Sequence, residues 1–212
     1  MRHLVRLVLV LVLALGGCGG GEAGAPADEA LGPVELVEAL RGGGYVLYLR
    51  HGATDMSQED THKTDVSRCD GMRNLTERGR RESRALGRAF EELAIPVGAV
   101  HASAYCRTRE TADLAFGGHR RSDVLTGFPD PGDAAYEARV RATRELLARP
   151  PADGENTVLV AHVKNLEAAA EVTLDEGELV VFEPLGGTGF RLRGRIPAAA
   201  WPQLVERLRR GP

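Results

Sequence analysis

The chain has 212 residues and carries 27 basic against 30 acidic side chains, which gives a formal net charge of −3. This balance does not support a nucleic-acid-binding protein or a polybasic membrane patch, so we expect no nucleic-acid partner. Residues 33–212 have a length that suits one domain with a full hydrophobic core.

The first 17 residues have the composition of an export signal. Arg2 and Arg6 precede nine apolar residues at 7–15, a run too short to cross a bilayer, which takes about 20 residues. A Leu-Gly-Gly-Cys sequence ending at Cys18 follows, and it resembles the cleavage box of bacterial lipoproteins, in which the cysteine is acylated. The alternative is an ordinary signal peptide with an incidental cysteine. Under both interpretations we expect an extracytoplasmic protein, and under the first it is anchored to the bacterial cell envelope through a lipid on Cys18.

The next stretch, residues 18–32, is rich in glycine and alanine and has no aromatic residue or hydrophobic periodicity. Such a composition is typical of a flexible tether. The predicted organisation is therefore a signal peptide at 1–17, a tether at 18–32 and one folded domain at 33–212.

The two cysteines of the domain are predicted to form a disulfide. If Cys18 carries lipid, Cys69 and Cys106 remain as a pair in an oxidising compartment, where disulfides persist. The alternative is a metal site that combines these cysteines with His62, Asp65 and Asp70. That cluster lacks any familiar ligand spacing.

Helix-like and strand-like segments alternate along the domain. The predicted helices lie at 34–41, from a Thr76 cap to Pro96, from a Ser103 cap onward, at 134–148 and at 201–210, and the predicted strands lie at 45–50, 97–102, 123–125, 157–161, 178–183 and 190–196. Residues 55–74 have no clear periodicity and are expected to form an irregular loop. The alternation predicts a three-layer α/β/α sandwich with a mostly parallel central sheet.

Chemically versatile side chains follow three of these predicted strands. Arg50 and His51 end one strand, Ser103 follows another, and His162 follows a third. In such sheets the ligand crevice lies beyond the carboxyl ends of the strands. A neutral histidine is a good nucleophile toward phosphorus, and Arg107, in the first turn of a helix, can bind two phosphate oxygens. Taken singly, His51 and His162 are better explained as structural histidines and Arg107 as a surface arginine. Together these residues predict a site for a phosphorylated ligand.

In this order and spacing the motifs resemble those of the histidine phosphatase superfamily, which includes the phosphoglycerate mutases. They are Arg50-His51-Gly52, a Leu75-Thr76-x-x-Gly79 helix opening, Ser103-x-x-x-Arg107-x-x-x-Thr111-Ala112 and His162 after a hydrophobic strand. The resemblance covers nearly all of residues 45–195 and implies a phosphoglycerate mutase-like fold. It also implies that His51 becomes phosphorylated and that water then hydrolyses the phosphohistidine. Arg50, Arg107 and His162 are expected to bind the phosphoryl oxygens, and no metal or other cofactor is expected.

Two features depart from the family pattern. Ala161 stands where many relatives have glycine before the second histidine, and its methyl group is expected to crowd the pocket slightly. The acid that should protonate the leaving oxygen is not evident. The candidates that remain open are Asp55, Asp123, Asp130, Asp133, Glu176 and Glu178. A member without a strong acid would favour substrates with good leaving groups, such as phosphohistidine.

We therefore expect a hydrolase that acts on a phosphomonoester or a phosphohistidine, with a small phosphorylated substrate from outside the cytoplasm or from the envelope. Mutase activity is disfavoured because glycolytic phosphoglycerates are cytoplasmic and the loops that would enclose such a substrate are short. The competing hypothesis is a non-catalytic lipoprotein that binds phosphate or a phosphorylated ligand in the same pocket.

Overall fold

A six-stranded sheet forms the centre of the computed structural model, which describes residues 30–62, 65–66, 68–127 and 129–210. The strands are β1 (Val46–Arg50), β2 (Val97–Ala102), β3 (Arg120–Arg121), β4 (Asn156–Ala161), β5 (Leu179–Gly186) and β6 (Gly189–Ile196). Their order in the sheet is β3-β2-β4-β1-β5-β6. The pairs β3-β2, β2-β4 and β4-β1 are parallel, whereas β5 is antiparallel to both of its neighbours. The predicted signal peptide, Cys18 and nearly all of the predicted tether lie outside the described residues.

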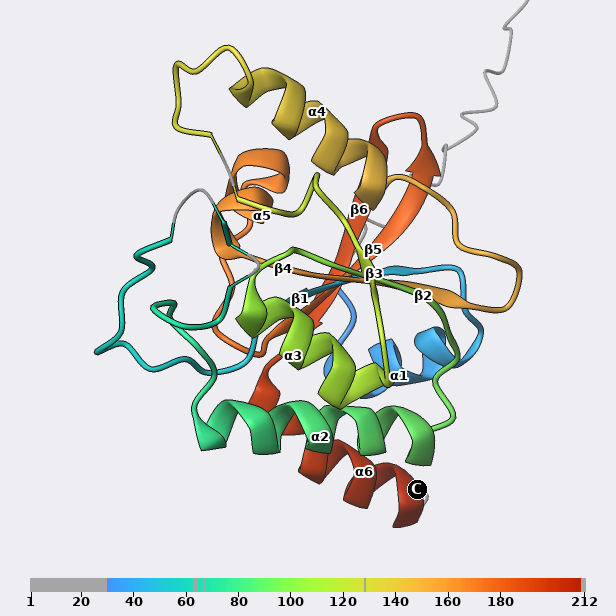
Figure 1. Ribbon diagram of the computed structural model, residues 1–212. Helices are drawn as coiled ribbons and strands as arrows, with labels where there is room; N and C mark the ends of the chain where they lie inside the picture. Colours follow the sequence, from blue (N-terminus) through green and yellow to red (C-terminus); the bar gives the residue numbers. More distant parts are fainter. Residues whose placement is uncertain (1–29, 63–64, 67, 128, 211–212) are drawn as a thin grey trace, which may run out of the picture.

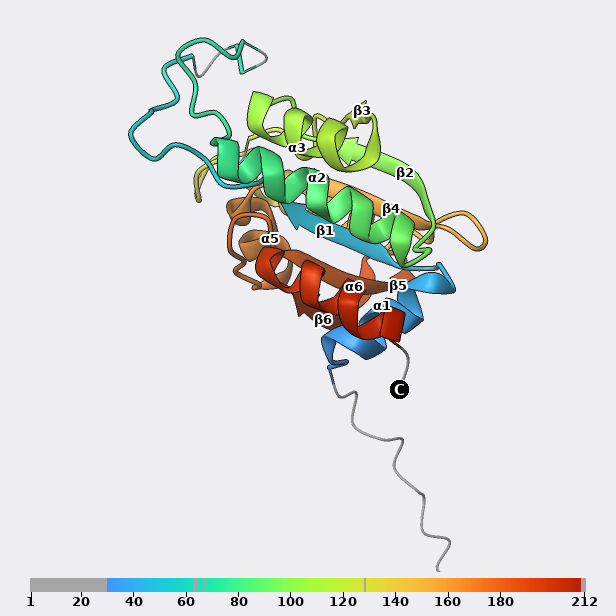
Figure 2. The same ribbon diagram turned by 90° about the horizontal axis from the view of Figure 1, so that it is seen from below.

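Helices cover both faces of the sheet. They are α1 (Pro33–Arg41), α2 (Glu77–Glu92), α3 (Cys106–Phe116), α4 (Tyr136–Leu147), α5 (Val163–Ala170) and α6 (Trp201–Arg210), with a short 3-10 helix at Ala198–Ala200. Figures 1 and 2 show α1, α2, α3 and α6 on one face and α4 and α5 on the other. The predicted three-layer α/β/α sandwich is thus confirmed. Within the described residues no helix is long and apolar enough to span a membrane.

The two central strands are buried on both faces, which explains their continuous apolar sequences. In β1, Leu47 and Leu49 pack in the core beneath α1, α2 and α6. The alternate residues Val46 and Tyr48 pack in the second core beneath α4 and α5. The edge strands need no such pattern, and β3 consists of two exposed arginines.

Helix α2 begins as the sequence predicts. The Thr76 Oγ1 accepts a hydrogen bond from the Gly79 amide at 3.1 Å, so that the side chain caps the helix. Gly79 also lets the helix start lie directly against the loop after β1, because a Cβ there would lie 2.2 Å from the Ala53 carbonyl oxygen. This close approach gives a physical reason for the glycine in the Leu-Thr-x-x-Gly motif.

Two details of the predicted elements were wrong, and one helix was missed. Helix α3 begins at Cys106 with Tyr105 as its N-cap residue, so Ser103 does not cap it. The short edge strand lies at Arg120–Arg121 rather than at 123–125, where Leu125 instead packs into the second core. Helix α5 was not predicted, because it is only eight residues long and follows His162 without a loop.

Candidate active site

The register of the parallel strands places the predicted site residues side by side. Arg50 at the end of β1 is paired with Ala161 at the end of β4. Ala102 at the end of β2 is paired with Val160 in β4. The next residues along these three strands are His51, His162 and Ser103, so the sheet brings them together at one edge.

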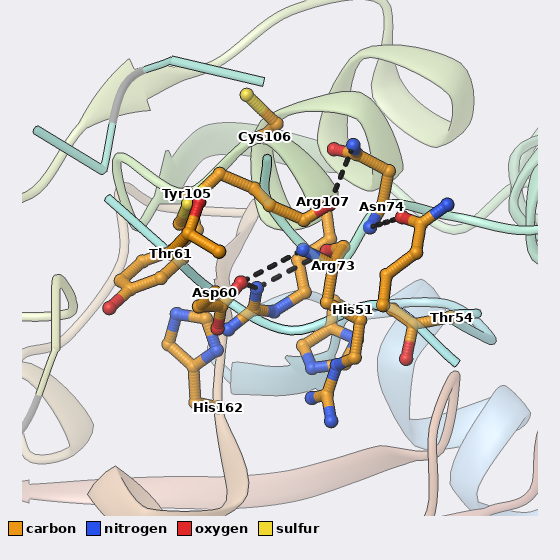
Figure 3. A network of polar contacts seen from close by, with 12 residues as sticks. His51, Thr54, Asp60, Thr61, Arg73, Asn74, Tyr105, Cys106, Arg107 and His162 are labelled. Carbon is orange, nitrogen blue, oxygen red and sulfur yellow. Dashed lines mark hydrogen bonds and ion pairs between the residues drawn. The ribbon is translucent and has the colours of Figure 1, made fainter. Parts of the chain in front are cut away.

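A cavity of about 300 Å³ opens at this edge. It is lined by Arg50, His51, Asp60, Arg73, Tyr105, Arg107, Gly127, His162, Val163, Lys164 and Asn165. All four predicted site residues, Arg50, His51, Arg107 and His162, are among them. Figure 3 shows the two histidines next to Arg107 and Asp60.

The orientation of His51 leaves one ring nitrogen free. Its Nδ1 lies 3.0 Å from the Gly52 carbonyl oxygen, which can only accept a hydrogen bond, so Nδ1 carries the hydrogen. Nε2 therefore keeps its lone pair. Burial, together with the positive charges of Arg107 and Arg50, lowers the pKa of His51 to about 3, although the bond to Gly52 opposes this shift. The ring is thus neutral at physiological pH, as a nucleophile must be.

The backbone around His51 is held from several sides. The His51 amide donates to the Ala161 carbonyl oxygen at 3.1 Å, and the next amide, of Gly52, donates to Thr111 Oγ1 at 3.0 Å. Thr111 Oγ1 in turn donates to the Arg107 carbonyl oxygen at 2.7 Å. This chain connects the Arg-His-Gly segment to helix α3 and explains why a threonine stands four residues after Arg107.

Arg107 is bound to a carboxylate that sequence reasoning missed. Its Nη1 donates to Asp60 Oδ1 at 3.0 Å and to the Arg73 carbonyl oxygen at 3.3 Å. The Arg73 amide donates to the same Asp60 oxygen at 2.9 Å. The side chain of Arg107 is 7% exposed and its guanidinium lies 4.4 Å from the Tyr105 ring centroid. The first turn of α3 therefore presents a fixed, buried cation to the cavity.

Three arginines of the cavity retain unused hydrogen-bond donors. The Nε atoms of Arg50, Arg73 and Arg107 are buried and have no hydrogen-bond partner within the described part of the chain. A buried donor without a partner costs free energy, and an anion in the cavity would supply acceptors. Three guanidinium groups around one cavity therefore favour a phosphate ligand.

His162 is oriented by the predicted strand-end serine. Its Nε2 lies 2.8 Å from Ser103 Oγ. When the hydroxyl donates to Nε2, Nδ1 carries the hydrogen and can donate to a phosphoryl oxygen. Burial lowers the pKa of His162 well below its usual value, and the neighbouring Arg107 lowers it further. The Tyr48 hydroxyl supports the same residue by donating to the His162 carbonyl oxygen at 2.8 Å.

The expected crowding by Ala161 was wrong. Ala161 is fully buried and packs in the core beneath α4 and α5, and it is not among the described residues that line the cavity. Alternation along β4 turns its side chain away from the face on which α3 lies. Its methyl group therefore leaves the cavity unchanged.

None of the six candidates for the acid lines the cavity, so the expectation that one of them protonates the leaving oxygen finds no support. Asp55 accepts bonds from Ser57, and Asp123 pairs with Arg121 on the surface. Asp130 and Asp133 lie in the exposed connection before α4. Glu178 is buried and accepts the Asp175 amide.

Glu176 lies near His51 but on the wrong side of the ring. Its Oε1 is 3.9 Å from His51 Nδ1, the nitrogen that contacts the Gly52 carbonyl oxygen, and 3.8 Å from Arg50 Nη2. The Thr54 hydroxyl and amide donate to its two oxygens at 2.6 and 3.1 Å. Glu176 can therefore help to orient Arg50 and His51, and it contacts His51 at Nδ1 and does not line the cavity.

A disulfide ties the loop after β1 to the start of α3. Cys69 and Cys106 are bonded, with their Cα atoms 5.5 Å apart, as predicted. The alternative of a metal site with these two thiolates is therefore wrong. Within the described residues no group of three or more histidine, cysteine or carboxylate side chains could hold a metal ion.

The fold and the cavity together define an α/β protein with a buried histidine at an arginine-rich cavity. Residues 46–127 match the family model of the histidine phosphatase superfamily (branch 1). This match confirms the resemblance to that superfamily over the segment that carries Arg50, His51 and Arg107. A comparison with curated proteins finds no match.

Solved structures show the same fold. The chain is similar to phosphoserine phosphatase from Entamoeba histolytica in complex with 3-phosphoglyceric acid, with 13% identity, a TM-score of 0.51, and coverage of 72% of this chain and 96% of that chain. It is also similar to phosphoglycerate mutase from Thermus thermophilus, with 21% identity, a TM-score of 0.50, and coverage of 72% and 98%. The predicted phosphoglycerate mutase-like fold is thereby confirmed.

Proposed function

We propose that this chain is a phosphatase of the histidine phosphatase superfamily, and that it hydrolyses small phosphomonoesters through a phosphohistidine on His51. The observation that carries the proposal is the hydrogen bond from His51 Nδ1 to Gly52, at 3.0 Å. It leaves Nε2 as the basic nitrogen of a neutral histidine at an arginine-rich cavity.

The surrounding groups match the needs of phosphoryl transfer, in which charge spreads over three equatorial oxygens. Arg107 and Arg50 bind these oxygens through their guanidinium groups, and His162 donates from Nδ1. Such donors are fixed before the substrate arrives and cost no reorganisation during the reaction. Protein cations thereby supply the charge stabilisation that metal ions supply in other phosphoryl-transfer enzymes.

Hydrolysis fits this cavity better than intramolecular transfer of the phosphoryl group. A mutase must shield its phosphorylated histidine from water between the two transfers. Among the described residues, the connection between α3 and α4 contributes only Gly127 to the lining of the cavity, and the loop between β1 and α2 contributes Asp60 and Arg73. This limited covering favours access of water to a phosphohistidine formed here.

We further propose that the substrate is a small phosphorylated molecule outside the cytoplasm, at the cell envelope. The predicted signal peptide and the lipid site at Cys18 support this location. The similar structures are named for phosphoserine and phosphoglycerate, which are small phosphorylated metabolites. The cavity volume of about 300 Å³ suits ligands of that size.

Phosphate release from 4-nitrophenyl phosphate by the purified protein, measured beside equilibrium binding of inorganic phosphate, tests this function. We expect turnover in the wild type and its loss in His51→Ala, with phosphate binding retained by the arginines. Saturable binding of phosphate without turnover in the wild type would instead identify the phosphate-binding lipoprotein. Neither binding nor turnover would contradict both.

A further inference from the structure

One carboxylate, Asp60, lies in the cavity together with the two histidines. Among the described residues that line the cavity it is the only acidic side chain. It comes from the loop between β1 and α2, which protrudes at one end of the molecule (Figure 2). We propose that Asp60 is the acid that protonates the leaving oxygen, and that the phosphoryl group releases it for this role by taking its place on Arg107. This inference rests on the proposed function.

The contact between Asp60 and Arg107 cannot persist unchanged when a phosphoryl group binds. Arg107 Nη1 is occupied by Asp60 Oδ1 at 3.0 Å, and a phosphate dianion competes for the same guanidinium. An exchange moves the carboxylate off the cation and leaves it beside the bound anion. The carboxylate then lies next to the phosphoryl group and its ester oxygen.

The exchange also raises the pKa of Asp60, which favours the protonated carboxyl group that an acid catalyst needs. Burial alone raises the pKa of Asp60, but the hydrogen bonds from Arg107 and the Arg73 amide outweigh it and hold the pKa below its usual value. Losing Arg107 and gaining a neighbouring dianion both raise the pKa. The ionisable groups that line the cavity with Asp60 are Arg107 and Tyr105 from the start of α3, Arg73 from its own loop, Arg50 and His51 from the end of β1, His162 from the end of β4 and Lys164 from α5.

The chemical steps balance once Asp60 has taken up one proton from water, as the phosphoryl group displaces it from Arg107. In the first step His51 Nε2 forms a bond to phosphorus, the bond from phosphorus to the ester oxygen breaks, and the proton of Asp60 moves to that oxygen to give the alcohol. In the second step water attacks phosphorus, the bond to Nε2 breaks, and the Asp60 carboxylate takes the proton of the water. The cycle ends with neutral His51, protonated Asp60 and inorganic phosphate.

Hydrogen bonds and a disulfide hold the loop that carries Asp60 in place. Asp60 Oδ1 accepts the Arg73 amide at 2.9 Å, and next to it the Thr61 amide and hydroxyl donate to the Gly71 carbonyl oxygen at 2.9 and 2.6 Å. The disulfide of Cys69 then fastens this loop to the residue before Arg107. These contacts hold the carboxylate at the cavity, as acid catalysis requires.

The test compares leaving groups in Asp60→Asn, which keeps an oxygen that can accept from Arg107 and the Arg73 amide and so preserves the loop. Turnover of 4-nitrophenyl phosphate, whose leaving group needs little protonation, is measured beside turnover of phenyl phosphate and phosphoserine. We expect kcat/KM to fall about 100-fold or more for phosphoserine and only a few-fold for 4-nitrophenyl phosphate. The alkaline limb of the wild-type pH profile for phosphoserine should also disappear.

The matched control is Asp70→Asn, which removes an exposed carboxylate, paired with Arg68, from the same loop. It should leave all three rates unchanged. Equal losses on all substrates in Asp60→Asn would show that Asp60 only positions Arg107, and no loss would show that it has no role. A wild type that cleaves 4-nitrophenyl phosphate but neither poorer leaving group would also overturn the inference while leaving the proposed function intact.

Discussion

Ser103 Oγ lies 2.8 Å from His162 Nε2, and this contact engages one of the two ring nitrogens of His162 within the protein. Ser103 is fully buried at the end of β2, so no water can easily replace its hydroxyl. The strand-end serine of the Ser-x-x-x-Arg motif therefore acts through the second histidine and not as a helix cap.

Ser103→Ala should lower kcat about 10-fold with little change in KM. The loss corresponds to about 1.4 kcal/mol, the contribution of one buried hydrogen bond that orients a transition-state donor. Steady-state kinetics with 4-nitrophenyl phosphate measures it, and Ser57→Ala on the surface is the control. A change in KM alone would contradict the assigned role.

The buried neutral histidines should make the domain less stable in mild acid. In the unfolded chain His51 titrates near pH 6.5, whereas in the folded domain its pKa is about 3. Between these values the unfolded state binds a proton that the native state does not. The free energy of unfolding therefore falls as the pH drops below about 6.5, by up to about 1.4 kcal/mol per pH unit for this residue.

Urea unfolding at pH 7 and pH 5 checks this dependence. His51→Gln removes the titrating group, so the variant should lose less stability than the wild type over this interval. His162 acts in the same direction and remains in the variant. Equal losses in the two proteins would show that His51 is not buried in its neutral form.

The disulfide between Cys69 and Cys106 should protect both thiols and stabilise the domain. In the Cys18→Ala protein we expect no alkylation of Cys69 or Cys106 without reductant, even after denaturation, and full alkylation after reduction. The double variant Cys69→Ala/Cys106→Ala should lose about 2–4 kcal/mol of unfolding free energy. Rapid labelling of Cys69 and Cys106 in the unreduced, denatured protein would rule the bond out.

The predicted lipid site can be tested apart from the domain. Cys18→Ala should abolish incorporation of radiolabelled fatty acid into the protein in bacterial cells, because the acylated thiol is gone. The Cys69→Ala/Cys106→Ala variant, which keeps Cys18, should still be labelled. Persistent labelling of Cys18→Ala would show that the cleavage box was misread.

The sequence predicts the positions of His51, Ser103 and His162 well because each follows a strand whose apolar composition is evident. Parallel pairing of β2, β4 and β1 then brings the three residues to one edge of the sheet. The apolar pattern of each strand, and the rule that ligands bind beyond the carboxyl ends of parallel strands, are sufficient to predict this part of the site.

Asp60 and Arg73 could not be predicted in the same way. They lie in an irregular loop without periodicity, and their places at the cavity depend on contacts between residues far apart in sequence. Asp60 and Arg107 lie 47 positions apart in the sequence, and the segment between them contains all of α2 and β2. The one available signal was the predicted bond between Cys69 and Cys106, which brings that loop to the start of α3.

The most direct test of the proposed function is a search for the phosphorylated histidine. The protein is mixed with a radiolabelled activated phosphoester, quenched within the first turnovers and tested for label that is stable in alkali and labile in acid. We predict such label in the wild type and in Asp60→Asn, and neither label nor turnover in His51→Ala. Turnover without label in the wild type, or label that persists in His51→Ala, would contradict a phosphohistidine on His51.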